Sequence, residues 1–135
     1  MRKVLIILTM LYLLSLNFGC AILSSSSINK EARLKERIDA AYQYLKERDY
    51  DKFMNLTEVA KTFDATARQK AISHAKGFPI VIDFEVLEIK VDGDEAKVKI
   101  KEVILFSSKK IQRVHFDYWK YKDNDWYIYD FAKAW

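Results

Sequence analysis

The sequence predicts an α+β domain in which N-terminal helices, one of them long, pack on a four-stranded antiparallel meander sheet. The first observation is a change of period. Apolar residues recur every three or four positions as far as residue 76, and every second position after Pro79. The second observation is a set of turn sequences, of which Asp92-Gly93 is the strongest, that divide the second half into hairpin strands. With 135 residues, the chain has room for one domain of ordinary size.

The first 20 residues have the three-part layout of an export signal. Arg2 and Lys3 precede an apolar stretch over residues 4–16, and the segment ends in Gly19-Cys20. A lone cysteine directly after a small residue resembles the lipobox of bacterial lipoproteins. That resemblance implies cleavage before Cys20 and a diacylglyceryl group on its thiol.

We therefore expect three segments: a signal peptide over residues 1–19, the lipidated Cys20 with a Ser-rich tether over residues 20–28, and a globular domain over residues 29–135. Two alternatives stay open. Residues 4–23 are about long enough to remain as an uncleaved membrane anchor, and an ordinary signal peptide would leave Cys20 as a free thiol. Lipidation or an anchor would hold the domain on the membrane of the cell envelope, outside the cytoplasm.

The charge argues against a nucleic-acid partner. The whole chain carries a formal charge of +4, but residues 1–19 contain two basic and no acidic residues, so their removal leaves +2. A phosphate-binding groove needs a clustered surplus of positive charge. We therefore expect no nucleic-acid binding.

Three helices are expected before Pro79. The longest covers about residues 29–48, a short second helix begins after Asp49 as its cap, and a third runs from about residue 64 to residue 76, before Gly77. The long helix has an apolar stripe at the i, i+4, i+7, i+8 and i+11 positions. The stripe consists of Leu34, Ile38, Ala41, Tyr42 and Leu45.

After Pro79 the alternation predicts four antiparallel strands, over about residues 80–91, 95–106, 110–122 and 126–132. The first strand changes parity at Val86 and Leu87, which a β-bulge would reconcile. Counting pairs back from an Asp92-Gly93 turn predicts a cross-strand charge ladder. Its pairs are Glu88 with Lys97, Glu85 with Lys99, and Asp83 with Lys101.

The connection between the second and third strands sets which side chains face the helices. A three-residue loop, Ser107-Ser108-Lys109, directs one alternating set inward, and an Asp123-Asn124 turn continues that set into the fourth strand. The inward set is Val114, Phe116, Tyr118, Tyr127, Tyr129 and Phe131. The opposite set, His115 and Asp117 with Trp119, Tyr121, Trp126 and Ile128, then points outward, and its last four members form an exposed aromatic patch that is typical of an interface. A different loop register would exchange the two faces.

The pattern as a whole resembles the NTF2-like superfamily, a cystatin-like α+β cone. The resemblance rests on the helix start Arg48-Asp49-Tyr50-Asp51-Lys52-Phe53 and on the terminal strand Asp125-Trp126-Tyr127-Ile128-Tyr129-Asp130-Phe131, and it spans about residues 29–135. Many small bacterial lipoproteins of unknown function look similar. The resemblance implies a curved sheet around the long helix, a pocket at the open end, and frequent dimers through the outer face of the sheet. It does not imply one activity, because the superfamily includes isomerases, hydrolases, dehydratases, transport adaptors and binding modules.

Sites for metals or cofactors are not expected. His74 and His115 are the only histidines, and the sequence has no HExxH or CxxC spacing. After residue 19 the only glycines are Gly77 and Gly93, so a Gly-rich phosphate loop is excluded. The sequence also shows no serine or cysteine nucleophile beside a base.

Glu102 is the residue with the most unusual position. It interrupts the inward series Ala96, Val98, Ile100, Ile104 and Phe106, so its carboxylate should project among apolar side chains. In the ketosteroid-isomerase branch of the superfamily, a pocket carboxylate removes a proton while a tyrosine or a protonated acid stabilises the oxyanion. The predicted inward residues Glu102, Phe116, Tyr118 and Tyr129 would line such a pocket, and Glu102 with Tyr118 or Tyr129 could imitate this arrangement, although no family motif matches these positions. The simpler interpretation is that Glu102 reaches the cavity rim or pairs with Arg113.

Two functions are compatible with these features. The preferred one is a non-catalytic envelope lipoprotein that binds a small apolar ligand or a protein partner, with the outer patch of Trp119, Tyr121, Trp126 and Ile128 as the contact or homodimer surface. The alternative is a small isomerase or hydrolase that uses Glu102 as its catalytic carboxylate.

Overall fold

Helices fill the first half of the described chain and strands fill the second half. The computed structural model describes residues 29–130, and residues 34–130 belong to one compact unit. The first helix covers residues 29–47 and is followed by α2 (Tyr50–Met54), the short 3₁₀ helix η1 (Val59–Thr62) and α3 (Ala65–Ala75). The strands are β1 (Ile80–Asp92), β2 (Glu95–Phe106), β3 (Lys109–Lys122) and β4 (Asp125–Asp130). They form one antiparallel sheet in the order β1-β2-β3-β4, which confirms the predicted α+β class and meander.

The ends of the helices follow from local backbone chemistry. The first helix ends in a Schellman motif. The amide of Asp49 donates to the carbonyl of Tyr44 at 2.8 Å, and Arg48 adopts a left-handed φ of 59°. The side chain of Asp49 then accepts a hydrogen bond from the amide of Lys52 and caps α2, as predicted. Asp64 caps α3 in the same way, through the amide of Ala67 at 2.7 Å.

The β1–β2 hairpin turns one residue later than the sequence predicts. Gly93 and Asp94 are the turn residues, and Gly93 has a φ of +60°, which glycine adopts without steric cost. The bulge at Leu87 is confirmed, because Val86 pairs with Ile100 while Glu88 pairs with Lys99.

The predicted cross-strand charge ladder is therefore wrong, because each acidic residue of β1 lies opposite a different residue of β2 than predicted. Glu85 lies opposite Lys101, and their side chains form an ion pair at 2.8 Å. Glu88 lies opposite Lys99 but pairs with Lys90 at 3.1 Å on its own strand. Moving the turn by one residue shifts the pairing of β1 with β2 by two residues. Each acidic residue therefore faces the β2 residue two positions further along, on the same face of the sheet.

The β2–β3 connection is a two-residue turn, and this corrects the predicted three-residue loop. Ser107 and Ser108 both have positive φ values, 47° and 66°, and Phe106 pairs directly with Lys109. Positive φ at both central residues is the geometry of a type I′ hairpin turn. The change of one residue moves every side chain of β3 to the opposite face of the sheet.

The two faces of β3 and β4 are consequently exchanged relative to the prediction. His115, Asp117, Trp119, Trp126 and Ile128 are buried, whereas Val114, Phe116 and Tyr129 are exposed. The Asp123-Asn124 turn is confirmed, with φ values of 53° and 62°, so β4 follows β3 in the exchange. Phe131 lies outside the described residues. The predicted interface patch of Trp119, Tyr121, Trp126 and Ile128 is thus wrong, because three of its members are buried in the core and Tyr121 packs against that core.

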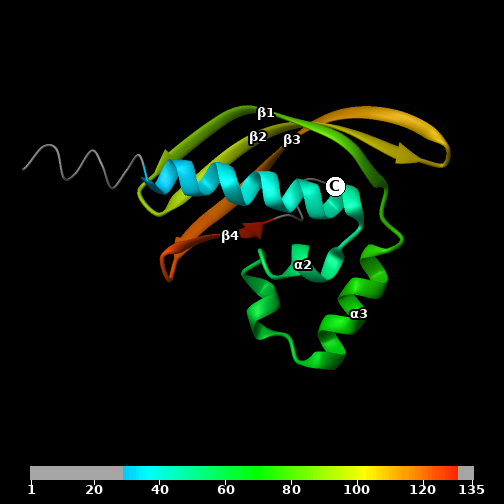
Figure 1. Ribbon diagram of the computed structural model, residues 1–135, viewed down its shortest axis with the longest axis horizontal. Coiled ribbons are helices and arrows are strands. Elements are labelled where there is room, and N and C mark those ends of the chain that lie inside the picture. The colour runs from blue at the N-terminus through cyan, green and yellow to red at the C-terminus, as the bar shows by residue number, and fades with distance from the viewer. Residues whose placement is uncertain (1–28, 131–135) are drawn as a thin grey trace, which may run out of the picture. The chain divides into compact units, whose positions relative to one another are not determined.

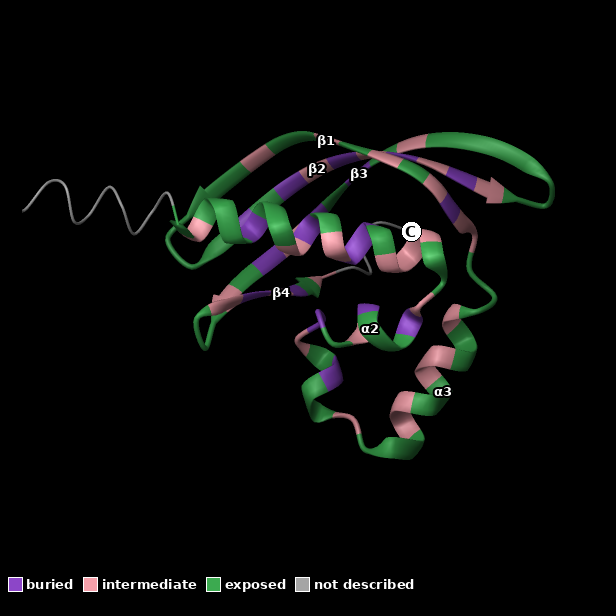
Figure 2. Ribbon diagram, viewed as in Figure 1, coloured by how far each residue is buried: buried purple, intermediate pink, exposed green. Residues whose placement is uncertain are grey.

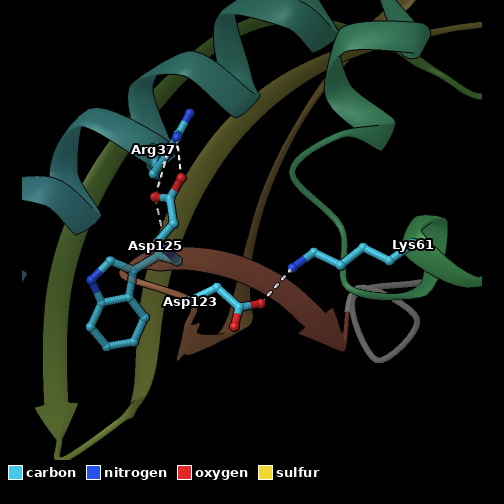
Figure 3. Close-up of polar contacts among 5 residues, drawn as sticks. Arg37, Lys61, Asp123 and Asp125 are labelled. Atoms are coloured by element: carbon cyan, nitrogen blue, oxygen red, sulfur yellow. Dashed lines mark hydrogen bonds and ion pairs between the residues drawn. The ribbon is translucent and has the colours of Figure 1, made fainter.

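The core lies between the long helix and the inner face of the sheet. Leu34, Ile38, Ala41 and Tyr42 form the buried stripe of the helix, which Figure 2 shows as purple bands alternating with exposed green positions. The strands β1 and β2 arch over this helix, and α2 and α3 lie on its opposite side, near its C-terminal end (Figure 1). Two ion pairs connect the helices to the β3–β4 turn and the start of β4 (Figure 3): Arg37 binds Asp125 through both carboxylate oxygens, and Lys61 of η1 contacts Asp123 of the turn at 3.4 Å.

Candidate functional site

An apolar cavity of about 330 Å³ lies beside the C-terminal end of the long helix. Its walls come from the end of that helix, from α2, η1 and α3, from the start of β1, and from Glu102 of β2. Most of the lining side chains are aliphatic or aromatic. The lining residues are Leu45, Tyr50, Phe53, Met54, Thr57, Val59, Phe63, Ala71, His74, Ala75, Phe78, Pro79, Val81 and Glu102.

Glu102 contributes a buried carboxylate to this cavity. The residue is only 2 % exposed, and it lies opposite Arg113 in the β2–β3 ladder. The Arg113 Nε atom donates a hydrogen bond to Glu102 Oε1. Within residues 29–130, the hydrogen bond that this carboxylate accepts is made at Oε1 and not at Oε2. The carboxylate is therefore paired with arginine, and its Oε2 atom can accept a further hydrogen bond.

Behind Glu102, a chain of buried polar groups runs along the inner face of the sheet to the long helix. His115 Nδ1 lies 3.4 Å from Glu102 Oε1, and His115 Nε2 lies 2.8 Å from the hydroxyl of Tyr42. That hydroxyl donates to Asp117 Oδ2 at 2.7 Å. Because the Tyr42 proton goes to Asp117, His115 Nε2 must be the donor to the Tyr42 oxygen.

The electrostatics of this polar chain are unusual for a protein interior. Burial, followed by the negative charge of Asp117 and the hydrogen bond to it, raises the pKa of Tyr42 well above its ordinary value, so the phenol stays neutral. His115 Nδ1 and Asp117 Oδ1 make no hydrogen bond within the described part of the chain. The set of Tyr42, Glu102, Arg113, His115 and Asp117 therefore brings two carboxylates together with one guanidinium and one imidazole in the interior.

Three of the four residues predicted to line a pocket lie elsewhere, and this is a correction. Phe116 and Tyr129 are 36 % and 42 % exposed on the outer face of the sheet. Tyr118 stands beside Tyr129 on that face, with the ring centroids 6.2 Å apart, and Lys97 Nζ lies 4.1 Å from the centre of the Phe116 ring. Only Glu102 reaches the cavity. The physical cause is again the two-residue turn at Ser107-Ser108, which exchanged the faces of β3.

Sequence reasoning missed Tyr42, His115 and Asp117 as members of the site. The predicted three-residue loop places the two β3 residues on the outer face, and the helical stripe marks Tyr42 only as a core residue. The available signal was the alternation of Arg113, His115 and Asp117 in one strand, opposite a strand that contains Glu102. Cys20, the predicted lipidation site, lies outside the described residues.

Residues 29–130 offer neither a metal site nor a membrane-spanning helix. In this range no group of three or more histidine, cysteine, aspartate and glutamate side chains is arranged to hold a metal ion. No helix in the same range is both long and apolar enough to span a bilayer.

The arrangement of helices on a four-stranded antiparallel sheet is an NTF2-like fold, and similar solved structures support this assignment. A SEC-C motif-containing protein from Psychrobacter arcticus is 14 % identical with a TM-score of 0.56, covering 76 % of this chain and 61 % of its own. An NTF2-like protein of unknown function from Shewanella oneidensis MR-1 is 11 % identical with a TM-score of 0.53, covering 73 % of this chain and 93 % of its own.

A further SEC-C motif-containing protein, from Rhodopseudomonas palustris, is 14 % identical with a TM-score of 0.51, covering 66 % of this chain and 69 % of its own. Of the Psychrobacter arcticus protein, this chain spans 61 %, which is less than two thirds of its length. Neither a family model nor a curated protein matches the sequence. At these identities the likeness concerns the fold alone.

Proposed function

We propose that this domain is a non-catalytic binding module for a small, mainly apolar ligand, which occupies the cavity that ends at Glu102. The observation that carries the proposal is the cavity itself. Its volume of about 330 Å³ falls in the range of small-molecule sites, roughly 300 to 1,000 Å³. Its walls are mostly apolar, and such sites typically add a few polar groups that orient the ligand. Here Glu102 is such a group.

The experiment is to fill the cavity from α3 without touching Glu102. Ala71 lines the cavity, whereas Ala67, one helical turn earlier, does not. Titration of the full-length protein with the apolar dye N-phenylnaphthylamine should give fluorescence enhancement in the wild type. Ala71→Phe should weaken dye binding at least tenfold, and Ala67→Phe should leave it unchanged. Equal binding by the two variants, or no binding by the wild type, would contradict the proposal.

The location of the protein is part of the same proposal. A lipidated Cys20 would hold the binding domain at the envelope membrane, and the tether over residues 20–28 would separate the two. Metabolic labelling with a fatty acid should mark the wild type and not Cys20→Ala. An unlabelled wild type would remove the lipoprotein interpretation and leave the cavity argument untouched.

An isomerase or hydrolase that uses Glu102 is the second candidate. It is favoured by a buried carboxylate that faces an apolar cavity. It is less well supported than binding, because Tyr118 and Tyr129, the expected oxyanion donors, lie on the other face of the sheet. Tyr42 is on the inner face, but its hydroxyl proton is held by Asp117.

A further inference from the structure

The second carboxylate oxygen of Glu102, Oε2, restricts which ligand can fill the cavity. A bound molecule would cover Oε2 and remove any water from it. A buried carboxylate oxygen without a hydrogen-bond donor is unfavourable, so a purely hydrocarbon ligand would be penalised at this end. The ligand must therefore present a donor to Oε2, and its remaining surface must be apolar.

The charge of the site selects among donors. Glu102 and Asp117 supply two negative charges, and Arg113 supplies one positive charge through Glu102 Oε1. His115 lies between the two carboxylates, 3.4 Å from Glu102 Oε1 and 3.3 Å from Asp117 Oδ1. A cation beside Oε2 would be attracted by the negative charge of the Glu102 carboxylate. A ligand carboxylate would instead add a third negative charge and would be repelled.

The walls of the cavity suit a cation as well as a hydrocarbon. Four aromatic rings line it, those of Tyr50, Phe53, Phe63 and Phe78. Aromatic faces attract ammonium groups, most strongly where water is excluded. An apolar wall with aromatic rings and one carboxylate oxygen is thus complementary to an organic ammonium ion.

We propose that the ligand is an apolar amine, bound as its ammonium ion, with the charged nitrogen at Glu102 Oε2 and the hydrocarbon part in the cavity. This inference rests on the proposed binding function and names the chemical class of the ligand.

Three probes of equal shape test the inference: cyclohexylmethylamine, cyclohexylmethanol and cyclohexanecarboxylate. Calorimetric titration of the full-length protein at neutral pH should give at least tenfold tighter binding for the amine than for the alcohol. The carboxylate should give no detectable binding. In Glu102→Gln the affinity for the amine should fall at least tenfold, to the level of the alcohol. The control Glu85→Gln, which removes a carboxylate from an exposed ion pair, should change nothing.

The outcomes separate the two proposals. If the amine and the alcohol bind the wild type equally, the amine inference is overturned and the apolar binding function stands. If neither these probes nor the apolar dye bind, both proposals fail. Should Glu102→Gln not fold, Ala71→Phe retains the Glu102–Arg113 pair and must still abolish amine binding; undiminished binding by that variant overturns the inference.

Discussion

Tyr42 connects the long helix to the polar groups of β3 through one hydroxyl. It donates to Asp117 Oδ2 and contacts His115 Nε2, and these groups are buried. A buried acceptor that loses its donor typically costs about 1–3 kcal/mol. At this scale the fold is therefore stabilised by a contact whose two ends are 75 residues apart in the chain.

The raised pKa of Tyr42 predicts a loss of stability in alkaline solution. The ordinary value is 10.0, and burial and Asp117 raise the pKa in the folded state. The folded protein thus retains the phenol proton more strongly than the unfolded chain. Tyr42 contributes its full stabilisation below about pH 10 and loses it as the pH rises further.

Urea unfolding at about pH 8 and at about pH 11 measures this effect. Tyr42→Phe should be less stable than the wild type at the lower pH, because Asp117 loses its donor. The further loss between the two pH values should be smaller in the variant, because the phenylalanine side chain has no phenolic proton to release. Equal alkaline losses in the two proteins would contradict the assignment.

The Ser107-Ser108 turn is the element that decides which side chains of β3 reach the core. Serine tolerates left-handed φ values less well than asparagine or glycine, yet both residues adopt them. The backbone here meets the geometric demand of a tight hairpin without the residues that such a turn prefers. The local sequence therefore favours a longer loop than the one that forms.

Replacing the turn by the preferred pair should stabilise the protein. Ser107→Asn with Ser108→Gly is expected to raise the free energy of unfolding by about 1 kcal/mol, because the new residues adopt positive φ at lower cost. The matched control is Ser73→Gly in α3, which should lower it by about 0.5 kcal/mol. Urea unfolding measures both. A destabilised turn variant would argue against the two-residue geometry.

In the whole molecule, the residues on the outer face of the sheet are not those that the sequence predicts. Trp119 and Trp126 are fully buried, so they belong to the core and not to a dimer surface. Any homodimer or envelope-protein contact through the outer face would instead use its exposed residues. The exposed apolar residues on that face are Val114, Phe116 and Tyr129.

Paired alanine variants distinguish these two roles. Trp119→Ala should lower the free energy of unfolding by about 3–5 kcal/mol, since it removes a large side chain from the core. Phe116→Ala should change it by less than about 1 kcal/mol. Urea unfolding and light scattering measure stability and mass together. A Trp119→Ala protein with wild-type stability but a lower molecular mass in solution, as for a lost dimer, would contradict the core assignment.

Local patterns predicted much of the fold, and their failures have one physical origin. The apolar stripe of the long helix, the Asp49 cap, the bulge at Leu87 and the Asp123-Asn124 turn each depend on neighbouring residues, and each is present. The position of Glu102 could be predicted because the alternation along β2 gives its inner face correctly. His115 and Asp117 were missed because the face of β3 depends on a single residue in the preceding turn.

Periodicity and capping are local properties, so the amino-acid pattern alone was sufficient for the α+β class, the order of helices and strands, and the inward position of Glu102. The face of β3 and β4 that joins the core, and therefore the set of residues around Glu102, became known only from the tertiary structure. The reason is the two-residue period of a strand. A change of one residue in a turn leaves the local pattern intact but reverses every side chain that follows.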